Sequence, residues 1–316
     1  MTRKKDLKIG HKKKILPRLI ICILIIVFFV LISFPFVNYI QKKRTTSIDI
    51  TDLYLAWNNA EYKNVYDLAT SILQNSPFNN AALTFKGYAA FYLSVSQSDS
   101  LLAQNYLDEA INSMRVALLS VQQSVRPQLM YMLGKSYFYK NTLSSYHYYS
   151  DLVIYYLNLA REEGFEADDI PELLGLSYAS LNMTQESIAA FTEALIARES
   201  DILLLSIAEQ YYKNEQFAAA KAYLHRVKTE TINDELRFKS SALLGQIFLH
   251  EENYDEAEKE FLSILKNDPT FADAYYGLGV IYENQGNLVK ARAEWRKALR
   301  MNVEHQGALQ KLAEYK

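Results

Sequence analysis

The chain has 316 residues, of which half are apolar and only 10 are glycine and 6 proline. This length and apolar content are ample for a large core or an extended array, and so few glycines and prolines argue against a β-rich fold. The single cysteine, Cys22, excludes a disulfide framework or a thiolate metal site within one chain. Residues 1–44 hold 11 of the 34 basic residues, so the remainder is acidic and a poor partner for nucleic acid.

The amino-terminal segment combines a basic tail, residues 1–18, with a nearly continuous run of Ile, Leu, Val and Phe. A helix that crosses a bilayer needs about 20 apolar residues, and this run has no polar face that would suit a soluble helix. A cleaved signal peptide would have a shorter apolar core and a small-residue cleavage site. A lipoprotein signal would place its apolar stretch before Cys22. We therefore expect an uncleaved transmembrane helix at residues 19–40.

The charges around this run predict its orientation. Eight Lys or Arg residues precede it and three follow it, at Lys42, Lys43 and Arg44. The positive-inside rule then keeps the amino terminus in the cytoplasm. We expect a single-pass protein of the inner (cytoplasmic) membrane, with everything after the helix on the far side, which in a bacterium is the periplasm.

The next two ranges each predict a pair of helices. In residues 46–79 only the second helix is clear, so this range is either a first hairpin or a connector from the membrane. In residues 82–120 a Ser- and Asp-containing loop at 94–100 favours a new helix cap. A register that contains Lys86 and Gly87 competes in the first helix of this range. The register that we expect there has its packing positions at Phe85, Tyr88, Ala89 and Tyr92.

From residue 127 onward the pattern becomes regular. Residues 127–165 predict a third hairpin with extra material at 141–147. Apolar residues spaced three and four apart then mark four hairpins of nearly equal length, at 168–200, 201–234, 238–271 and 272–305. Residues 306–316 look like a capping helix, which shields the last apolar face of such an array.

The last of these hairpins shows the sequence pattern most clearly. Its first helix carries Tyr275, Leu278, Gly279 and Tyr282, and its second carries a stripe that includes Trp295. This arrangement resembles a tetratricopeptide repeat, a unit of about 34 residues with W-x2-L-G-x2-Y and then A-x3-F. The resemblance covers residues 46–305 and implies an all-α, right-handed superhelix of about seven hairpins plus a carboxy-terminal capping helix, preceded by one transmembrane helix.

The resemblance also implies where a partner binds. Positions 2, 5, 9, 12 and 13 of each first helix line the concave groove in this family. Tyrosines at such positions offer a large contact area at little entropic cost. The alternative is that these side chains fill a narrow groove and pack on one another. The residues that we expect to contact a protein partner are Tyr131, Lys135, Phe138, Tyr139, Tyr212, Gln246, Tyr276 and Asn284.

Catalytic and cofactor patterns are missing from the sequence. The five histidines have no metal-ligand spacing, and Gly277-Leu278-Gly279 lies within a predicted helix. We expect no enzyme activity, no cofactor and no metal. The prediction is a membrane-anchored scaffold for protein–protein interactions in envelope or periplasmic assembly. Alternatives are a structural subunit of a periplasmic flagellar collar, or a regulator that binds glycan or peptidoglycan or serves as the accessory domain of an enzyme.

Overall fold

The computed structural model describes residues 50–144 and 148–315, and within these ranges all regular secondary structure is helical. The predicted all-α fold is therefore confirmed for this part of the chain. The described helices are α2 (Ile50–Asn58), α3 (Tyr62–Asn75), α4 (Asn80–Val95), α5 (Ser100–Ala117), α6 (Arg126–Thr142), α7 (Ser150–Glu162), α8 (Ile170–Ser180), α9 (Thr184–Ala197), α10 (Asp201–Lys213), α11 (Phe217–Glu230), α12 (Asp234–His250), α13 (Tyr254–Asn267), α14 (Ala272–Asn284), α15 (Leu288–Met301) and α16 (Gln306–Glu314).

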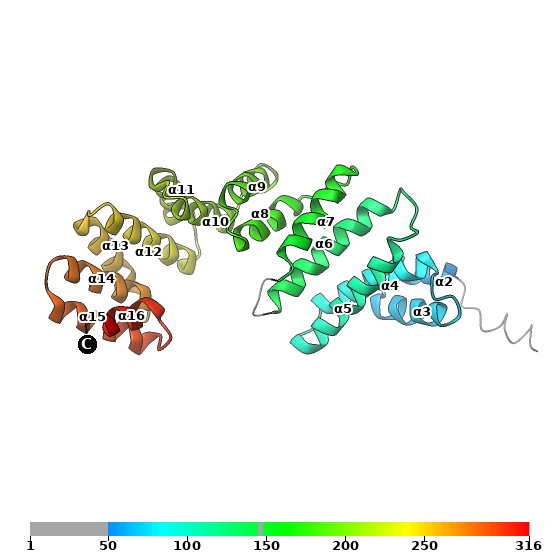
Figure 1. The fold of residues 1–316 in the computed structure, drawn as a ribbon, viewed down its shortest axis with the longest axis horizontal. Helices are drawn as coiled ribbons and strands as arrows, with labels where there is room; N and C mark the ends of the chain where they lie inside the picture. Colours follow the sequence, from blue (N-terminus) through cyan, green and yellow to red (C-terminus); the bar gives the residue numbers. More distant parts are fainter. Residues whose placement is uncertain (1–49, 145–147, 316) are drawn as a thin grey trace, which may run out of the picture.

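The helices pair as hairpins, and successive hairpins stack in chain order. Each even-numbered helix from α2 to α14 packs against the odd-numbered helix that follows it, and each one from α4 onward also packs against the helix before it. Figure 1 shows the result as an elongated array, with α2 and α3 at one end and α14 to α16 at the other. In such an array each unit contacts mainly its neighbours, which leaves long surfaces open.

The core is a row of apolar seams. Each seam is formed by the two helices of one hairpin together with the first helix of the next hairpin. Phe191 of α9, Phe261 of α13 and Trp295 of α15 are almost fully buried, each in a different seam. A small residue on the first helix makes room for each of them. A Cβ atom on Gly279 would lie only 2.3 Å from Nε1 of Trp295. Glycine therefore lets the two helices of this hairpin approach closely enough to bury the indole.

The second hairpin has the register that contains Gly87, not the one that we expected. A Cβ atom on Gly87 would lie 2.4 Å from Cγ of Met114, which is the same relation that Gly279 has to Trp295. This close approach places Gly87 at the helix crossing, while Tyr88, one residue further along the helix, is buried as we expected. Several aromatic residues at helical spacing allowed both registers, and the helix contact decides between them.

Local capping explains several helix starts. Asp99 accepts hydrogen bonds from the backbone N–H groups of Leu101 and Leu102, as the Ser- and Asp-containing loop predicted. Asn233 caps α12 in the same way, so that helix begins at Asp234, four residues before the predicted range. The additional residues of the third range partly lengthen α6, which extends over 17 residues to Thr142.

The predicted basic tail and the transmembrane helix at residues 19–40 lie outside the described residues. Among the helices that the structure does describe, none is both long enough and apolar enough to cross a membrane. The anchor therefore stays a prediction from the sequence.

Candidate binding face of the first helices

The face on which we expected a partner is built by the first helix of each hairpin. We call it the first-helix face: the side of α4, α6, α8, α10, α12 and α14 at repeat positions 2, 5, 9, 12 and 13. Within α4, α6 and α8, and again within α10, α12 and α14, neighbouring first helices contact one another directly, without a second helix between them. Side chains from hairpins about 40 residues apart therefore meet on this face.

The first-helix face has an aromatic cleft where α2, α4 and the start of α6 meet. Its volume is about 490 Å³. With Gly87 at the helix crossing, Ala81, Thr84 and Tyr88 occupy positions 2, 5 and 9 of α4. Gln128 occupies position 2 of α6. The residues that line the cleft are Tyr54, Trp57, Asn80, Ala81, Thr84, Phe85, Tyr88, Ser120, Val121, Gln122, Val125 and Gln128.

Aromatic contacts shape this cleft. The ring of Trp57 lies 5.3 Å from that of Phe85 and 5.8 Å from that of Tyr88, measured between ring centroids. The Tyr54 ring meets Phe85 edge-on at 5.1 Å, and Tyr54 itself is 46 % exposed. Edge-to-face contacts of this kind add stabilisation beyond the apolar area that they bury. The rings therefore pack on one another and together form one side of the cleft.

The hydroxyl of Tyr88 is the unusual group in the cleft. Tyr88 is only 5 % exposed, and within the described residues its hydroxyl has no hydrogen-bond partner. Burial raises the pKa of this phenol, so it stays a neutral donor at physiological pH. A buried hydroxyl without a partner costs about 1–3 kcal/mol. A bound group that accepts its hydrogen bond would recover part of that cost.

Two predicted contact residues, Tyr131 and Lys135, bond within the chain. The Tyr131 hydroxyl donates to Asp169 at 2.9 Å and accepts from Lys135 Nζ at 2.9 Å. Lys135 also forms an ion pair with Asp169 at 2.7 Å. Burial, opposed by Lys135 and reinforced by the Asp169 carboxylate, raises the pKa of Tyr131 to about 12. This triad links α6 to the start of the next hairpin.

A second cavity lies between the end of α6 and α8. Its volume is about 350 Å³. Phe138 is at position 12 of α6, and Leu176 is at position 9 of α8, so the cavity opens on the first-helix face. The remaining lining residues are Asn141, Thr142, Ser150, Ser177 and Ser180.

Tyr139 and Phe138, neighbours on α6, have different surroundings. The Tyr139 ring packs edge-on against Phe91 of α4, at 5.3 Å between centroids. Phe138 remains on the wall of the second cavity. Phe138 is thus placed to meet a ligand, whereas much of Tyr139 serves packing between hairpins.

The carboxy-terminal half of the first-helix face carries Tyr212, Gln246 and Tyr276. The Tyr212 hydroxyl lies 3.1 Å from Nε2 of His250, and burial raises the Tyr212 pKa, with Tyr276 adding to the rise. The Tyr276 ring contacts His305, at 5.0 Å between centroids. Gln246 is half-buried on α12, the first helix of the hairpin between those of Tyr212 and Tyr276. These side chains share one face.

Two polar residues of the same half differ in setting. Asn284 is exposed, and its amide donates to the Val280 carbonyl of its own helix at 2.9 Å. Glu209 is exposed at the surface as well, yet the surrounding protein raises its pKa by desolvation, opposed by Lys213 and Lys239. Contact of all eight predicted residues with a partner stays a prediction.

The sequence pattern missed the aromatic cleft because the expected register gave Tyr88 a packing role alone, whereas the buried Tyr88 also lines the cleft. Gly87 was the signal that could have found it. A glycine one residue before a tyrosine, in the first helix of a hairpin, marks position 8 and leaves the tyrosine at position 9, on the first-helix face. Trp57 could not be assigned in this way, because the first helix of residues 46–79 matched no repeat position.

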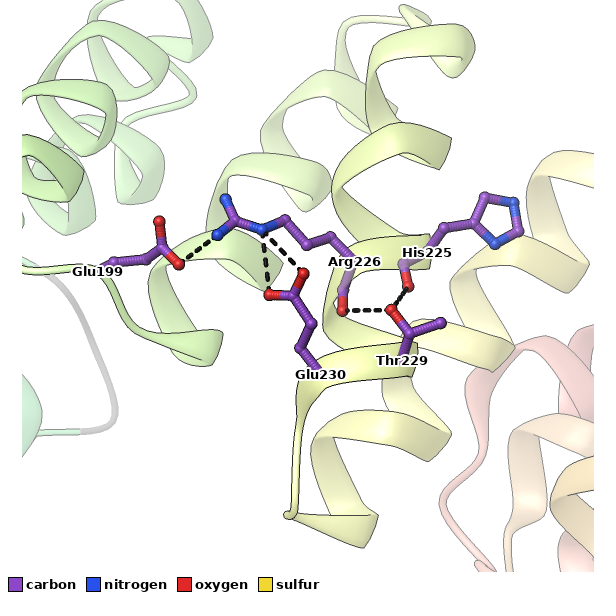
Figure 2. Close-up of polar contacts among 5 residues, drawn as sticks. All are labelled: Glu199, His225, Arg226, Thr229 and Glu230. Carbon is purple, nitrogen blue, oxygen red and sulfur yellow. Dashed lines mark hydrogen bonds and ion pairs between the residues drawn. The ribbon is translucent and has the colours of Figure 1, made fainter.

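The second helices carry a different kind of cluster. Figure 2 shows Arg226 of α11 between Glu199 and Glu230, while the ring of His225 points away from them. Arg226 donates to both carboxylates, with 3.1 Å from Nε to Oε2 of Glu230. The pair with Glu199 ties α11 to the connection between α9 and α10, whereas the pair with Glu230 lies within α11. Among the described residues, no group of three or more His, Cys, Asp or Glu side chains is arranged to hold a metal ion.

Comparison with known families identifies the repeats in the carboxy-terminal part. Residues 205–270 and 242–308 match the family model described as tetratricopeptide repeat. Residues 205–308 carry tetratricopeptide repeats. The predicted resemblance is therefore confirmed over the hairpins from α10 to α15.

Solved structures extend the likeness in fold beyond the matched tetratricopeptide repeats. The carboxy-terminal part of a TPR repeat-containing protein from Cytophaga hutchinsonii is 12 % identical, with 83 % of this chain and 98 % of that chain covered and a TM-score of 0.56. That similarity shows a shared fold. YrrB, described as a TPR protein with an unusual peptide-binding site, is 27 % identical over 56 % of this chain and 91 % of its own, at a TM-score of 0.43. MamA is 18 % identical over 49 % and 90 %, at 0.42.

Proposed function

We propose that this protein is a non-enzymatic, membrane-anchored scaffold that binds protein partners on its first-helix face during assembly of an envelope or periplasmic complex. One observation carries the binding part of the proposal. The first-helix face holds two cavities that the side chains of the chain itself leave open, of about 490 and 350 Å³. Concave sites with apolar walls and a few polar groups are typical binding sites.

The composition of the face supports a protein as the partner. Tyrosine and tryptophan are enriched in the central residues of protein interfaces, because they bury much area and lose few rotamers. Tyr54, Trp57 and Tyr88 gather in the aromatic cleft, and Tyr212 and Tyr276 lie further along the same face. An array of hairpins offers such residues over a long surface.

The amino-terminal sequence supports the anchor. Basic residues precede the apolar run of 19–40, and a helix there would hold the array close to one membrane surface. A scaffold tethered in this way meets membrane-bound partners at a raised effective concentration.

Site-specific photocrosslinking in cells tests the binding proposal. A photoreactive residue replaces Gln128, which lines the aromatic cleft, and in a control strain replaces Ala222, which is exposed on α11. We expect a discrete crosslinked protein from Gln128 and none from Ala222. Equal products from both positions, or none from Gln128, would contradict the proposal. Mass spectrometry of the product then separates a translocation factor, a flagellar ring protein and a cell-wall synthase.

A topology reporter tests the anchor separately. An enzyme that is active only outside the cytoplasm is fused after Lys316, and the same enzyme is fused before Met1 as the control. We expect activity from the first fusion alone. Activity from the second fusion alone would show the orientation opposite to the proposed one. Equal recovery of the protein in the soluble and membrane fractions would contradict the membrane anchor.

A further inference from the structure

The two cavities on the first-helix face lie at opposite ends of α6. Gln128, near its start, lines the aromatic cleft, and Phe138, near its end, lines the second cavity. Ten helical residues separate them, which corresponds to about 15 Å along the helix axis. One step between neighbouring first helices adds about 10 Å across it. The two cavities are therefore about 18 Å apart along a diagonal path.

The walls of the second cavity favour an apolar guest. Its polar side chains already bond within the chain, which leaves Phe138 and Leu176 as the open surface. A sugar needs polar partners for its hydroxyl groups, and polar groups buried without them are costly. The internal bonds join Ser177 to the Leu173 carbonyl, Ser180 to the Ser177 carbonyl, and Asn141 to Ser150.

The aromatic cleft also lacks charge. None of its lining residues is Asp, Glu, Lys or Arg. At its rim the Asn80 amide already donates to the Ser120 carbonyl, at 2.5 Å. The buried Tyr88 hydroxyl, which has no partner among the described residues, can donate to a guest once the side chains that cover it move aside. A backbone carbonyl next to a bound apolar side chain is an acceptor of the required kind.

The path between the cavities crosses positions 5 and 9 of α6. Tyr131 and Lys135 occupy these positions, and the Lys135 ammonium is balanced by Asp169 at 2.7 Å. Charge along the path is thus compensated within the chain. A charged guest would gain no unpaired partner there and would lose hydration.

We propose that the first-helix face binds an extended polypeptide segment through two large apolar side chains, about six residues apart, with uncharged residues between them. An extended chain rises about 3.3 Å per residue, so about six residues span the 18 Å between the cavities. Residues an even number apart also point to the same side of an extended chain. This proposal rests on the proposed function and specifies its partner.

The test is a selection of random dodecapeptides displayed on phage, against the full chain in lipid nanodiscs. We expect enriched peptides to carry two large apolar residues about six positions apart. Affinities of the enriched peptides are then measured by fluorescence anisotropy. Gln128→Trp fills the aromatic cleft and Thr142→Trp fills the second cavity, and each should weaken binding at least tenfold. Ala222→Trp, on an exposed position of α11, is the matched control and should change affinity less than twofold.

Other outcomes would overturn the two-cavity proposal. Enriched peptides with no preferred spacing, peptides rich in charge, or peptides that bind both cavity variants normally would each contradict it. So would binding of soluble peptidoglycan fragments that Gln128→Trp abolishes while no peptide is enriched. Tyr88→Phe serves as a second, milder variant, and loss of its donated hydrogen bond should weaken peptide binding about three- to tenfold. The proposed function is tested by a different result. It fails if no protein is crosslinked at Gln128 in cells, whatever the peptide selection gives.

Discussion

Tyr131 is half-buried and Tyr88 is buried on the first-helix face, and their hydroxyl groups have opposite environments. The Tyr131 hydroxyl bonds to Asp169 and Lys135, whereas that of Tyr88 has no partner in the described part of the chain. We expect Tyr131→Phe to lower the free energy of unfolding by about 1–2 kcal/mol, because it leaves charged partners less well bonded. We expect Tyr88→Phe to leave it unchanged or raise it by about 1 kcal/mol. Urea denaturation of the two variants measures the difference, and equal losses would contradict the assignment.

The raised pKa of Tyr131 makes a second residue-level prediction. Its pKa is about 12 in the folded chain, above the value near 10 of an unfolded tyrosine. The stability that Tyr131 contributes is therefore complete below pH 10 and is lost as the pH rises towards 12. We expect Tyr131→Phe to flatten the fall of Tm between pH 10 and 11.5. Tyr155→Phe replaces an exposed tyrosine and is the control. The Tm of this variant should fall with pH as steeply as that of the native protein.

Gly279 tests the packing of a single seam. Its replacement by Ala would place a Cβ atom 2.3 Å from Nε1 of the fully buried Trp295. Overpacking of this kind costs about 1–3 kcal/mol, which exceeds the gain of up to about 1 kcal/mol from replacing a helical glycine. We expect a lower urea midpoint for Gly279→Ala. In a Trp295→Leu background the penalty should shrink, and an unchanged penalty would show that the contact is not its cause.

At the scale of the element, α16 covers the last seam of the array. Its Ala308 is fully buried against Trp295, and the ring of Tyr315 stacks on that indole at 5.9 Å between centroids. Polar contacts hold it in place, because Lys311 and Tyr315 both bond to Glu283. The helix acts as the cap that a stack of apolar faces requires.

Deletion of residues 306–316 should therefore expose Trp295. In a Trp57→Phe background Trp295 is the single tryptophan, so its emission is unambiguous. We expect a red shift of that emission and faster amide exchange in α14 and α15. Exchange in α4 to α7 should not change, because distant hairpins are coupled only through their neighbours. Unchanged emission would contradict a capping role for α16.

At the scale of the molecule, local spacing was enough for the helical hairpins but not for the binding face. The positions of Tyr275, Leu278 and Tyr282 indicate a helix because periodicity reflects burial against the next element. The bonding of Tyr131 with Asp169 joins residues 38 apart, and no local pattern records it. The aromatic cleft was missed for a related reason. Its register depends on the contact between Gly87 and Met114, which belongs to tertiary packing.

The whole account depends on a partner lying across the first helices and not around the outside of the array. Hydrogen exchange of the full chain, with and without the protein trapped at Gln128, measures this most directly. We predict slower exchange in α2, α4, α6 and α8 when the partner is bound, and unchanged exchange in α5, α7 and α9. Protection confined to α5, α7 and α9 would contradict the account.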